Sequence, residues 1–498
     1  MKAKTLLLLT ALLLALPACA SIPTLQDLQA TAVAGTLEAI HAQTETAHEF
    51  ETAVAATVAA QTGPEGGEPV EGGTPAAGSG EATPASGSTP TPTPGGVEPD
   101  PTAEPVQQDL VLGAVGFSQE ERSVSLGFFV SNPNLELTIT GAEYILTLSD
   151  ASGKILYLEE VLLPVLFPDH ETGIALNVNL PEDNTAATAT IEFAGGTAVQ
   201  TGPLAPLTGH DAAIWANDGF FDVAAEFANP YDFFIENITA SVVLFDADNR
   251  IVGGGIRFWN YVSGLGGNAV TVPVSGGASA VRAELYPLVY AVPAPVVEQD
   301  RPDGAAVPVV VTTDFAMESE ERALYAVEIG NPNPGHAIPQ TLFTVIGYTQ
   351  DGSIRFVETT WMNTLGPEMS SVMGNNVYLN GEDGDISRIE VHLNENVDFE
   401  PSGAIPPIRF ENLQVDDDGI GYTFVADLVN PHPIDLENAW VHIVVRDENG
   451  VLIYVNREPV NLVPAGQTLV IDHWAPQLEI EPASVEMYLL PVYAELQE

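Results

Sequence analysis

The chain has 498 residues, enough for several separate hydrophobic cores, and its 68 acidic and 14 basic residues give a net charge of −54. This charge argues against nucleic acid as a partner, because binding it depends on Lys and Arg side chains that neutralise phosphates. It predicts a soluble, self-repelling surface, with cation binding or adaptation to high salt as the alternative.

The N-terminus has the pattern of a bacterial export signal. Lys2 and Lys4 precede an apolar run over residues 6–16, which is too short to span a bilayer. The run leads to Leu-Pro-Ala-Cys, ending at Cys19, which resembles the lipobox of bacterial lipoproteins. The resemblance implies that residues 1–18 are removed as a signal peptide and that Cys19 is lipidated, anchoring the chain at the extracytoplasmic face of the cell membrane. An ordinary secretory peptide is the alternative.

Two segments without a β pattern follow Cys19. Residues 19–62 are rich in Ala, Thr and Glu, and their apolar residues alternate by three and four, which predicts a helical stalk, with a coiled coil as the alternative. Residues 63–108 are dominated by Pro, Gly, Ser, Thr and Glu and cannot bury a core. We therefore predict a disordered, extended Pro/Thr/Gly linker between the membrane and the rest of the chain.

An apolar strand ending in Asn-Pro occurs four times in the remaining sequence. The four asparagines lie 97, 102 and 99 residues apart: Asn132, Asn229, Asn331 and Asn430. A fixed period near one hundred residues indicates tandem domains. We predict four, over residues 109–203, 204–300, 301–400 and 401–498.

Each repeat has the same internal order of short apolar runs, which predicts an all-β fold of four tandem Ig-like β-sandwich domains. A first strand precedes the Asn-Pro strand, and a third strand, a tight turn, a fourth strand, a corner and a closing strand follow it. In the first repeat these elements are 110–117, 125–132, 143–150, the turn 150–153, the corner 166–168 and the closing strand 189–194. Because Pro cannot continue a central ladder and Asn can bond the local backbone, we interpret the Asn-Pro asparagines as structural.

Shared details suggest that a two-domain unit was duplicated. The first and third repeats both carry Asn-Pro-Asn preceded by Glu-Glu-Arg, whereas the second and fourth end alike, at 283–292 and 485–496. We therefore expect the first repeat to contact the second as the third contacts the fourth.

The third strand and its turn resemble the FxLYD family of bacterial envelope proteins. The residues that carry this resemblance are Val242 to Asp246 with Asn249, and Val444 to Gly466 in the fourth repeat. The Asn-Pro-Asn repeats also resemble late-embryogenesis-abundant domains of the water-stress type. Both resemblances imply Ig-like or fibronectin-like sandwiches, and neither brings a catalytic residue or a cofactor.

No catalytic motif is evident, so we predict a protein that is not an enzyme and has no cofactor. His170, His210 and His336 fall in predicted turns, and no spacing suggests a nucleophile, a base and an acid that converge. No paired-Cys or His metal motif is present. The nearest candidates for a cation site are acidic clusters, which turns also favour: Asp416, Asp417 and Asp418, with Asp383 and Asp385.

Aromatic residues gather in the second repeat and mark the candidate ligand-binding positions: Phe233, Phe234 and Trp259. Trp259 and Trp361 both lie thirty residues after an Asn-Pro asparagine, which favours a repeated core role for these two. Phe233 and Phe234 follow a Pro turn and are the better surface candidates.

The sequence thus predicts a surface-exposed lipoprotein that acts as a non-catalytic interaction or spacer module with an envelope protein or glycan partner. The alternative is an extracellular glycan- or ligand-binding protein that uses loops of the second repeat.

Overall fold

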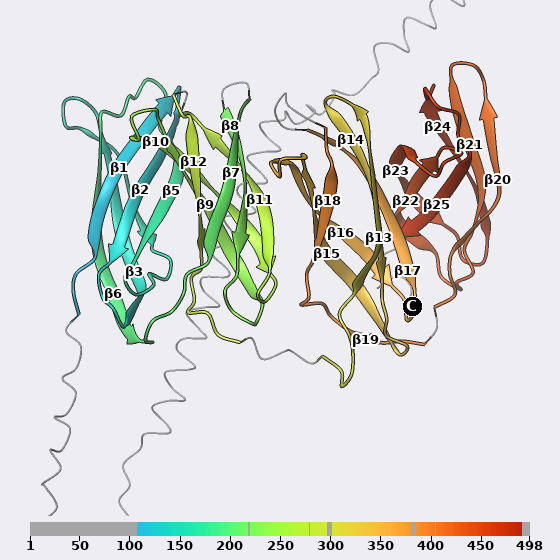
Figure 1. Cartoon of the computed structure of the whole chain (residues 1–498), viewed down its shortest axis with the longest axis horizontal. Coiled ribbons are helices and arrows are strands. Elements are labelled where there is room, and N and C mark those ends of the chain that lie inside the picture. The colour runs from blue at the N-terminus through green and yellow to red at the C-terminus, as the bar shows by residue number, and fades with distance from the viewer. Residues whose placement is uncertain are drawn as a thin grey trace, which may run out of the picture. The chain divides into compact units, whose positions relative to one another are not determined.

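The computed structural model describes residues 107–217, 220–277, 279–295, 301–379, 385–403 and 405–490. Throughout these residues the chain is all-β, and its strands pair antiparallel without any helix (Figure 1). No described segment is therefore a helix long and apolar enough to cross a membrane. The predicted signal peptide, the predicted stalk and nearly all of the predicted linker lie outside the described residues.

Six strands form two sheets in each of the first two repeats. The first repeat contains β1 (Val111–Glu120), β2 (Ser123–Asn132), β3 (Leu137–Ser149), β4 (Ile155–Leu162), β5 (His170–Asn179) and β6 (Thr188–Gln200). The second contains β7 (Thr208–Asn217), β8 (Phe220–Ala228), β9 (Ile235–Phe245), β10 (Ile251–Val262), β11 (Gly267–Ser275) and β12 (Arg282–Leu288). One sheet of each repeat is built around the Asn-Pro strand, in the orders β1-β2-β5 and β11-β8-β7, and we call it the Asn-Pro sheet. The other has the orders β4-β3-β6 and β10-β9-β12, and we call it the opposite sheet.

The third and fourth repeats have the same two sheets. The third contains β13 (Val309–Ser319), β14 (Arg322–Gly330), β15 (His336–Tyr348), β16 (Ile354–Leu365), β17 (Ser370–Tyr378), β18 (Arg388–Leu393) and the short β19 (Glu400–Pro401). The fourth contains β20 (Arg409–Asp417), β21 (Gly421–Val429), β22 (Leu436–Arg446), β23 (Leu452–Val463), β24 (Thr468–Pro476) and β25 (Ser484–Leu490). Their Asn-Pro sheets are β13-β14-β17 and β20-β21-β24, and their opposite sheets are β16-β15-β18, with β19 beside β15, and β23-β22-β25.

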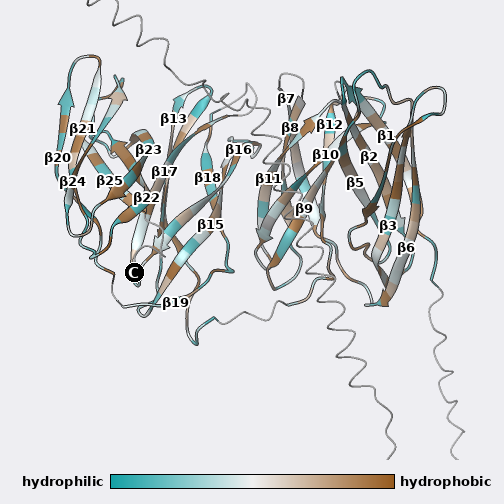
Figure 2. Ribbon diagram, turned by 180° about the vertical axis from the view of Figure 1, so that it is seen from behind, coloured by the Kyte–Doolittle hydropathy of each residue, from teal (hydrophilic) through white to brown (hydrophobic). Residues whose placement is uncertain are grey.

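The two sheets of each repeat share a hydrophobic core, as in a β-sandwich. In β2, Val124, Leu126, Phe128 and Val130 alternate with residues of the other face, and all four are fully buried. This period of two places every second side chain on the inner face, and Figure 2 shows the alternation of hydrophobic and hydrophilic residues along the strands. The only cysteine of the sequence, Cys19, lies outside the described residues, so no disulfide contributes to these cores and apolar packing accounts for them.

The predicted strands are present in all four repeats, but the order of elements predicted for each repeat lacked one strand. It placed none between the corner and the closing strand, where β5, β11, β17 and β24 lie, and it also lacked the short β19 of the third repeat. Each of these pairs with the Asn-Pro strand along its length, for example Val124 with Val178. Short runs such as 170–179 mix polar and apolar residues, so their alternation is weak.

The predicted tight turns between the third and fourth strands are confirmed. The residue that closes each turn has a positive φ: 84° at Gly153, 61° at Asn249, 92° at Gly352 and 80° at Gly450. Asp150 Oδ1 accepts backbone hydrogen bonds from Ser152 and Lys154 across its turn, at 2.8 and 3.0 Å. Gly and Asn supply the left-handed geometry that L-residues with larger side chains avoid.

The Asn-Pro asparagines are structural, as predicted, and they connect the two sheets. Asn132 ends β2, yet its Nδ2 donates to the carbonyls of Leu137 and Leu166, at 2.8 and 2.9 Å. Leu137 begins β3 and Leu166 lies in the corner after β4, so one amide holds both chain reversals. Its Oδ1 accepts the backbone N–H of Asn134. The same three contacts recur at the other asparagines, all buried: Asn229, Asn331 and Asn430.

Glycines allow the Asn-Pro sheet of the first repeat to pack closely on the opposite sheet of the second. A Cβ at Gly116 would lie 2.0 Å from the carbonyl oxygen of Ile251. Buried Ser125 bonds both the carbonyl and the N–H of Gly254, at 2.7 and 2.8 Å. Ser241 accepts the N–H of Ala175 at 2.9 Å. We call this contact between the first two repeats the first junction. In it, the backbones of β2 and β5 lie directly against those of β9 and β10.

The second and third junctions use the corresponding sheets. At the second, Ala224 and Ala269 of one Asn-Pro sheet pack on Ile346 and Tyr348 of the next opposite sheet. At the third, small and branched residues meet in the same way, and an ion pair joins Asp314 to Arg446. We expected the first repeat to contact the second as the third contacts the fourth. Both contacts do use the same pair of sheets, and so does the contact between the second and third repeats.

Candidate functional site

Trp259, one of the three aromatic candidates, lies in the core of the second repeat. It is 6% exposed, and its ring meets Phe227 edge to face, with centroids 6.3 Å apart. The core role predicted for Trp259 is confirmed, and its ring is not available to a ligand at the surface.

Phe233 and Phe234 are half-buried in the turn after Pro230. Phe233 packs against the second core, and its ring stacks on Tyr231 with centroids 5.1 Å apart. The Tyr231 hydroxyl donates to the carbonyl of Ala205 at 2.7 Å. This small aromatic group therefore holds the start of the repeat against its Asn-Pro turn.

The core role predicted for Trp361 is wrong, since this side chain is 49% exposed. Val262 pairs with Ile235 in the second repeat, and Leu365 pairs with Ile338 in the third. Val262 lies 33 residues after its asparagine, whereas Leu365 lies 34 residues after its own. One extra residue moves a side chain to the other face of a strand, so buried Met362 takes the place of Trp259 and Trp361 faces outward.

The acidic candidates serve turns. Asp418 Oδ1 accepts the backbone N–H groups of Ile420 and Gly421, both at 2.9 Å, and Asp417 Oδ1 accepts that of Gly419 at 2.8 Å. Two further candidates, Asp416 and Asp385, are exposed, and Asp383 lies outside the described residues. Within the described ranges, no three His, Cys, Asp or Glu side chains are grouped closely enough to hold a metal ion.

A Glu-His-Tyr group in the fourth repeat, with a buried histidine and tyrosine and a partly exposed Glu458, was missed from the sequence. His473 on β24 contacts Glu458 Oε2 through Nδ1 at 2.7 Å and the Tyr454 hydroxyl through Nε2 at 2.8 Å. Asn456 donates to the same hydroxyl at 3.0 Å. These residue types serve acid–base catalysis elsewhere, but His473 and Tyr454 are only 7% and 8% exposed. They fill the space between β23 and β24 as a satisfied polar network.

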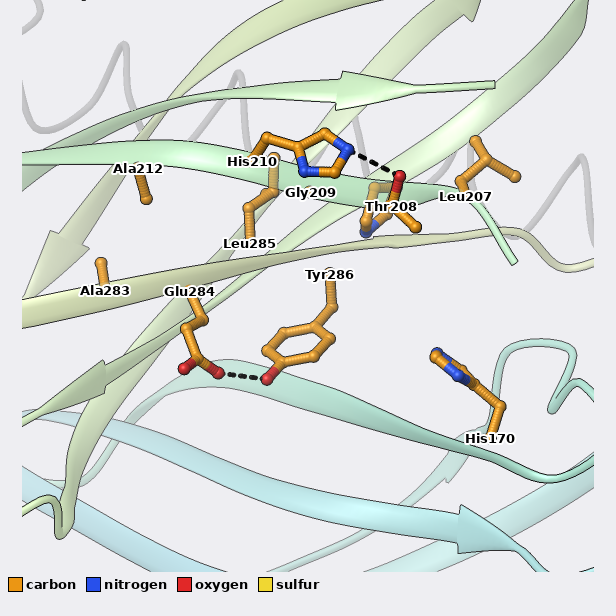
Figure 3. Close-up of a pocket in the computed structure, with 11 residues that line it drawn as sticks. His170, Leu207, Thr208, Gly209, His210, Ala212, Ala283, Glu284, Leu285 and Tyr286 are labelled. Atoms are coloured by element: carbon orange, nitrogen blue, oxygen red, sulfur yellow. Dashed lines mark hydrogen bonds between the residues drawn. The ribbon is translucent and has the colours of Figure 1, made fainter. Parts of the chain in front are cut away.

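A cavity of about 260 Å³ lies beside β7 and β12 of the second repeat (Figure 3). Figure 3 shows His210 directed at Thr208, Glu284 beside Tyr286, and His170 of the first repeat across from them. His210 Nε2 lies 2.8 Å from Thr208 Oγ1, and the Tyr286 hydroxyl donates to Glu284. The polar side chains of His210 and Glu284 are therefore already paired with Thr208 and Tyr286.

The three histidines expected in turns lie in strands. His170 begins β5, His336 begins β15, and His210 is the third residue of β7. Burial lowers the pKa of His170, and the nearby Glu171 carboxylate opposes this shift. A largely neutral imidazole at the edge of the cavity offers hydrogen bonds but no fixed charge for an anionic ligand.

Acid is expected to weaken the third junction through His442. The ring is 3% exposed, and its Nδ1 lies 3.3 Å from the carbonyl oxygen of Gly374 in the third repeat. Burial lowers the pKa of His442 to about 4, whereas an unfolded histidine titrates near 6.5. Between these values the unfolded chain binds more protons, so the free energy of unfolding falls as the pH drops, by about 3 kcal/mol in all.

Urea unfolding at pH 7 and at pH 4.5 measures this effect. We expect His442→Gln to show a smaller loss of stability on acidification than the unmodified chain. His336→Gln, at a half-buried position away from this junction, is the matched control and should keep the full loss. Equal pH dependence in His442→Gln and the unmodified chain would contradict the assignment.

A comparison with protein-family models finds no match for the chain, and a comparison with curated proteins finds no significant match in sequence.

Proposed function

We propose that the chain is a membrane-anchored lipoprotein whose four repeats are Ig-like domains and act as a non-catalytic interaction or spacer module on the extracytoplasmic face. The observation that carries the proposal is the repeated junction, in which each of the first three Asn-Pro sheets packs on the opposite sheet of the following repeat. Domains joined only by linkers move independently, whereas buried apolar contacts and hydrogen bonds restrict such motion. A module of this kind can hold binding surfaces of different repeats at fixed distances from one another.

The residues that resemble the FxLYD family support the domain assignment. Val242 and Leu244 are fully buried in the second core, and Phe245 is 4% exposed. Asp246 Oδ1 accepts the backbone N–H groups of Asp248 and Arg250 and so closes the turn after β9. These roles are packing and turn formation, so the resemblance bears on the fold and adds no site.

The anchor is tested by comparing the full chain with Cys19→Ala in a bacterial host. We expect the unmodified chain to enter the detergent phase of a temperature-induced detergent partition and to be degraded when intact cells are treated with protease. The variant lacks the thiol that carries the lipid and should move to the aqueous phase. Identical partition of the two proteins would reject lipidation at Cys19, and resistance to external protease would reject surface exposure.

Glycan binding by the second repeat has weaker support, because Trp259 is buried and Phe233 packs against the core. We expect envelope polysaccharide to be retained equally by the full chain and by a Phe233→Ala/Phe234→Ala variant. Retention that disappears in the double variant, at unchanged urea midpoint, would move the function to glycan recognition.

A further inference from the structure

The outer face of the last Asn-Pro sheet, β20-β21-β24, carries an exposed tryptophan. Trp474 on β24 is 52% exposed, and Val470 on the same side of this strand is 60% exposed. The indole lies against Gly421, since a Cβ added to this glycine would lie 2.7 Å from the ring atoms Cε2 and Nε1. The backbone of β21 therefore supports part of the ring, and the rest of the ring is open to a partner.

The first three Asn-Pro sheets have smaller side chains at this position. Trp474 pairs with Thr423, which lies seven residues before Asn430. When the other repeats are counted in the same way, the residues in place of Trp474 are compact: Asn177, Pro273 and Asn376. The sheets that pack on a following repeat thus use compact residues here, whereas the last sheet has a large aromatic ring of the kind that is enriched in interfaces.

Carboxylates lie on the same face as the ring. Asp472 is two residues before Trp474 on β24, so both side chains point to the same side of the sheet, about 7 Å apart. Asp416 on β20 pairs with Thr423 and is therefore on this face as well. The face carries two further carboxylates and one cation, which is ion-paired with the second of them at 3.7 Å: Asp427, Glu411 and Arg409. The face is therefore negatively charged, and a positively charged partner complements it.

Other parts of the chain hold an arginine between an aromatic ring and a carboxylate. Arg282 Cζ lies 3.9 Å from the centroid of the Phe245 ring, and the same guanidinium is ion-paired with Glu284, two residues along β12. The third repeat has the same group, with the guanidinium carbon 3.7 Å from the ring centroid: Arg388, Tyr348 and Glu390. A guanidinium suits both contacts, because its plane stacks on a ring while its N–H groups bond a carboxylate.

Trp474 and Asp472 provide the ring and the carboxylate of such a group but not the arginine. Within the part of the chain that the structure describes, no Lys or Arg lies over the Trp474 ring, and none is ion-paired with Asp472. An arginine from a partner would complete the group.

We propose that the outer face of the last Asn-Pro sheet binds a basic, arginine-containing segment of a partner protein, with one guanidinium stacked on Trp474 and bonded to Asp472. This inference rests on the proposed interaction function and names the chemistry of the partner. Asp416 lies two strands from Trp474, about 10 Å away, and can pair with a second basic residue of the segment. The same carboxylates repel anionic glycans and anionic lipid headgroups.

The test titrates the full chain carrying Cys19→Ala with the capped peptide Arg-Thr-Arg-Thr-Arg and follows binding by calorimetry. We expect saturable binding at one site per chain, weakening as the salt concentration rises. A capped Lys-Thr-Lys-Thr-Lys peptide has the same charge but no planar guanidinium, so it should bind about threefold more weakly.

Two variants of the face separate the ring from the charge. Trp474→Leu removes the ring and Asp472→Asn removes the carboxylate, and each should lower the affinity for the arginine peptide about threefold to fivefold. Trp361→Leu and Asp398→Asn change an exposed tryptophan and an exposed aspartate of the third repeat. These matched controls should bind as the unmodified chain does, and equal urea midpoints check that all four variants are folded.

Absence of saturable binding, equal affinity for the two peptides, or an equal loss in the control variants would overturn the proposal. Binding of neutral polysaccharide, or dimerisation, that is lost in Trp474→Leu would assign the face to a glycan or to a second copy of the chain and would overturn it as well. The detergent partition of the chain with Cys19 does not depend on this face. A failed titration beside a lipidated, surface-exposed chain would therefore reject this site and leave the proposed function in place.

Discussion

Replacement of Asn331 by Ala is expected to lower the free energy of unfolding by about 3 kcal/mol, because several buried partners are left unpaired at once. Asn331 Nδ2 donates to the carbonyls of His336 and Leu365, at 2.8 and 3.0 Å. Its Oδ1 accepts both the backbone N–H and the side-chain amide of Asn333, at 3.0 and 2.7 Å. Asn333 in turn holds Ala306 at the start of the repeat, so the loss extends to that segment.

Urea denaturation of the full chain measures this loss. Asn449→Ala removes an asparagine from an exposed turn and is the matched control, with an expected change below about 0.5 kcal/mol. If Asn331→Ala and Asn449→Ala shift the midpoint equally, the amide does not connect the sheets as we infer.

Replacement of Gly116 by Val is expected to separate the first two repeats and cost about 3 kcal/mol, within the range measured for overpacked sites. The Cβ would lie 2.0 Å from the carbonyl oxygen of Ile251, which belongs to the backbone and cannot move aside as a side chain can. Gly116 is not among the positive-φ residues, so the conformation of β1 itself accepts a β-branched residue. The expected damage is therefore confined to the junction.

Urea unfolding with two probes distinguishes this outcome. We expect the unfolding of the first repeat in Gly116→Val to shift to lower urea while that of the fourth repeat stays in place. Gly335→Val, in an exposed turn, serves as the control and should leave both transitions unchanged. An unaltered first transition in Gly116→Val would mean that the two sheets do not meet at this glycine.

Local chemistry explains which parts of the fold can be predicted from the sequence. Positive φ angles at Gly153 and Asn249 are intrinsic to those residue types, and the proline after Asn132 ends a central strand in any setting. The buried alternation along β2 is likewise present in the sequence itself. The turns, the Asn-Pro corner and five strands in each repeat could therefore be identified in advance.

Features that depend on distant residues could not be identified. Trp361 faces outward because of one extra residue in its repeat, which an offset counted from the asparagine does not reveal. His473 and Glu458 meet only because β23 and β24 lie in facing sheets. The cavity beside β7 and β12 is lined by residues of both of the first two repeats, so no local pattern marks it.

The contact between successive repeats joins two different faces, so nothing in its geometry closes it after four repeats. Contacts of this kind can continue from one molecule to the next as fibres. The two end faces differ from the covered ones in a way that opposes such growth. At the centre of the covered Asn-Pro sheets the residues are small: Gly127, Ala224 and Ala326. The corresponding position of the last Asn-Pro sheet is Val425, paired with the exposed Asp472.

The outer face of the first opposite sheet is also acidic. Glu143 and Glu160 lie close together on β3 and β4, and their contact raises the pKa of Glu143. Glu192 on β6 pairs with Ile145 in the same sheet. End-to-end association through these two faces would therefore bring carboxylates of one molecule close to those of the next, and their repulsion opposes it.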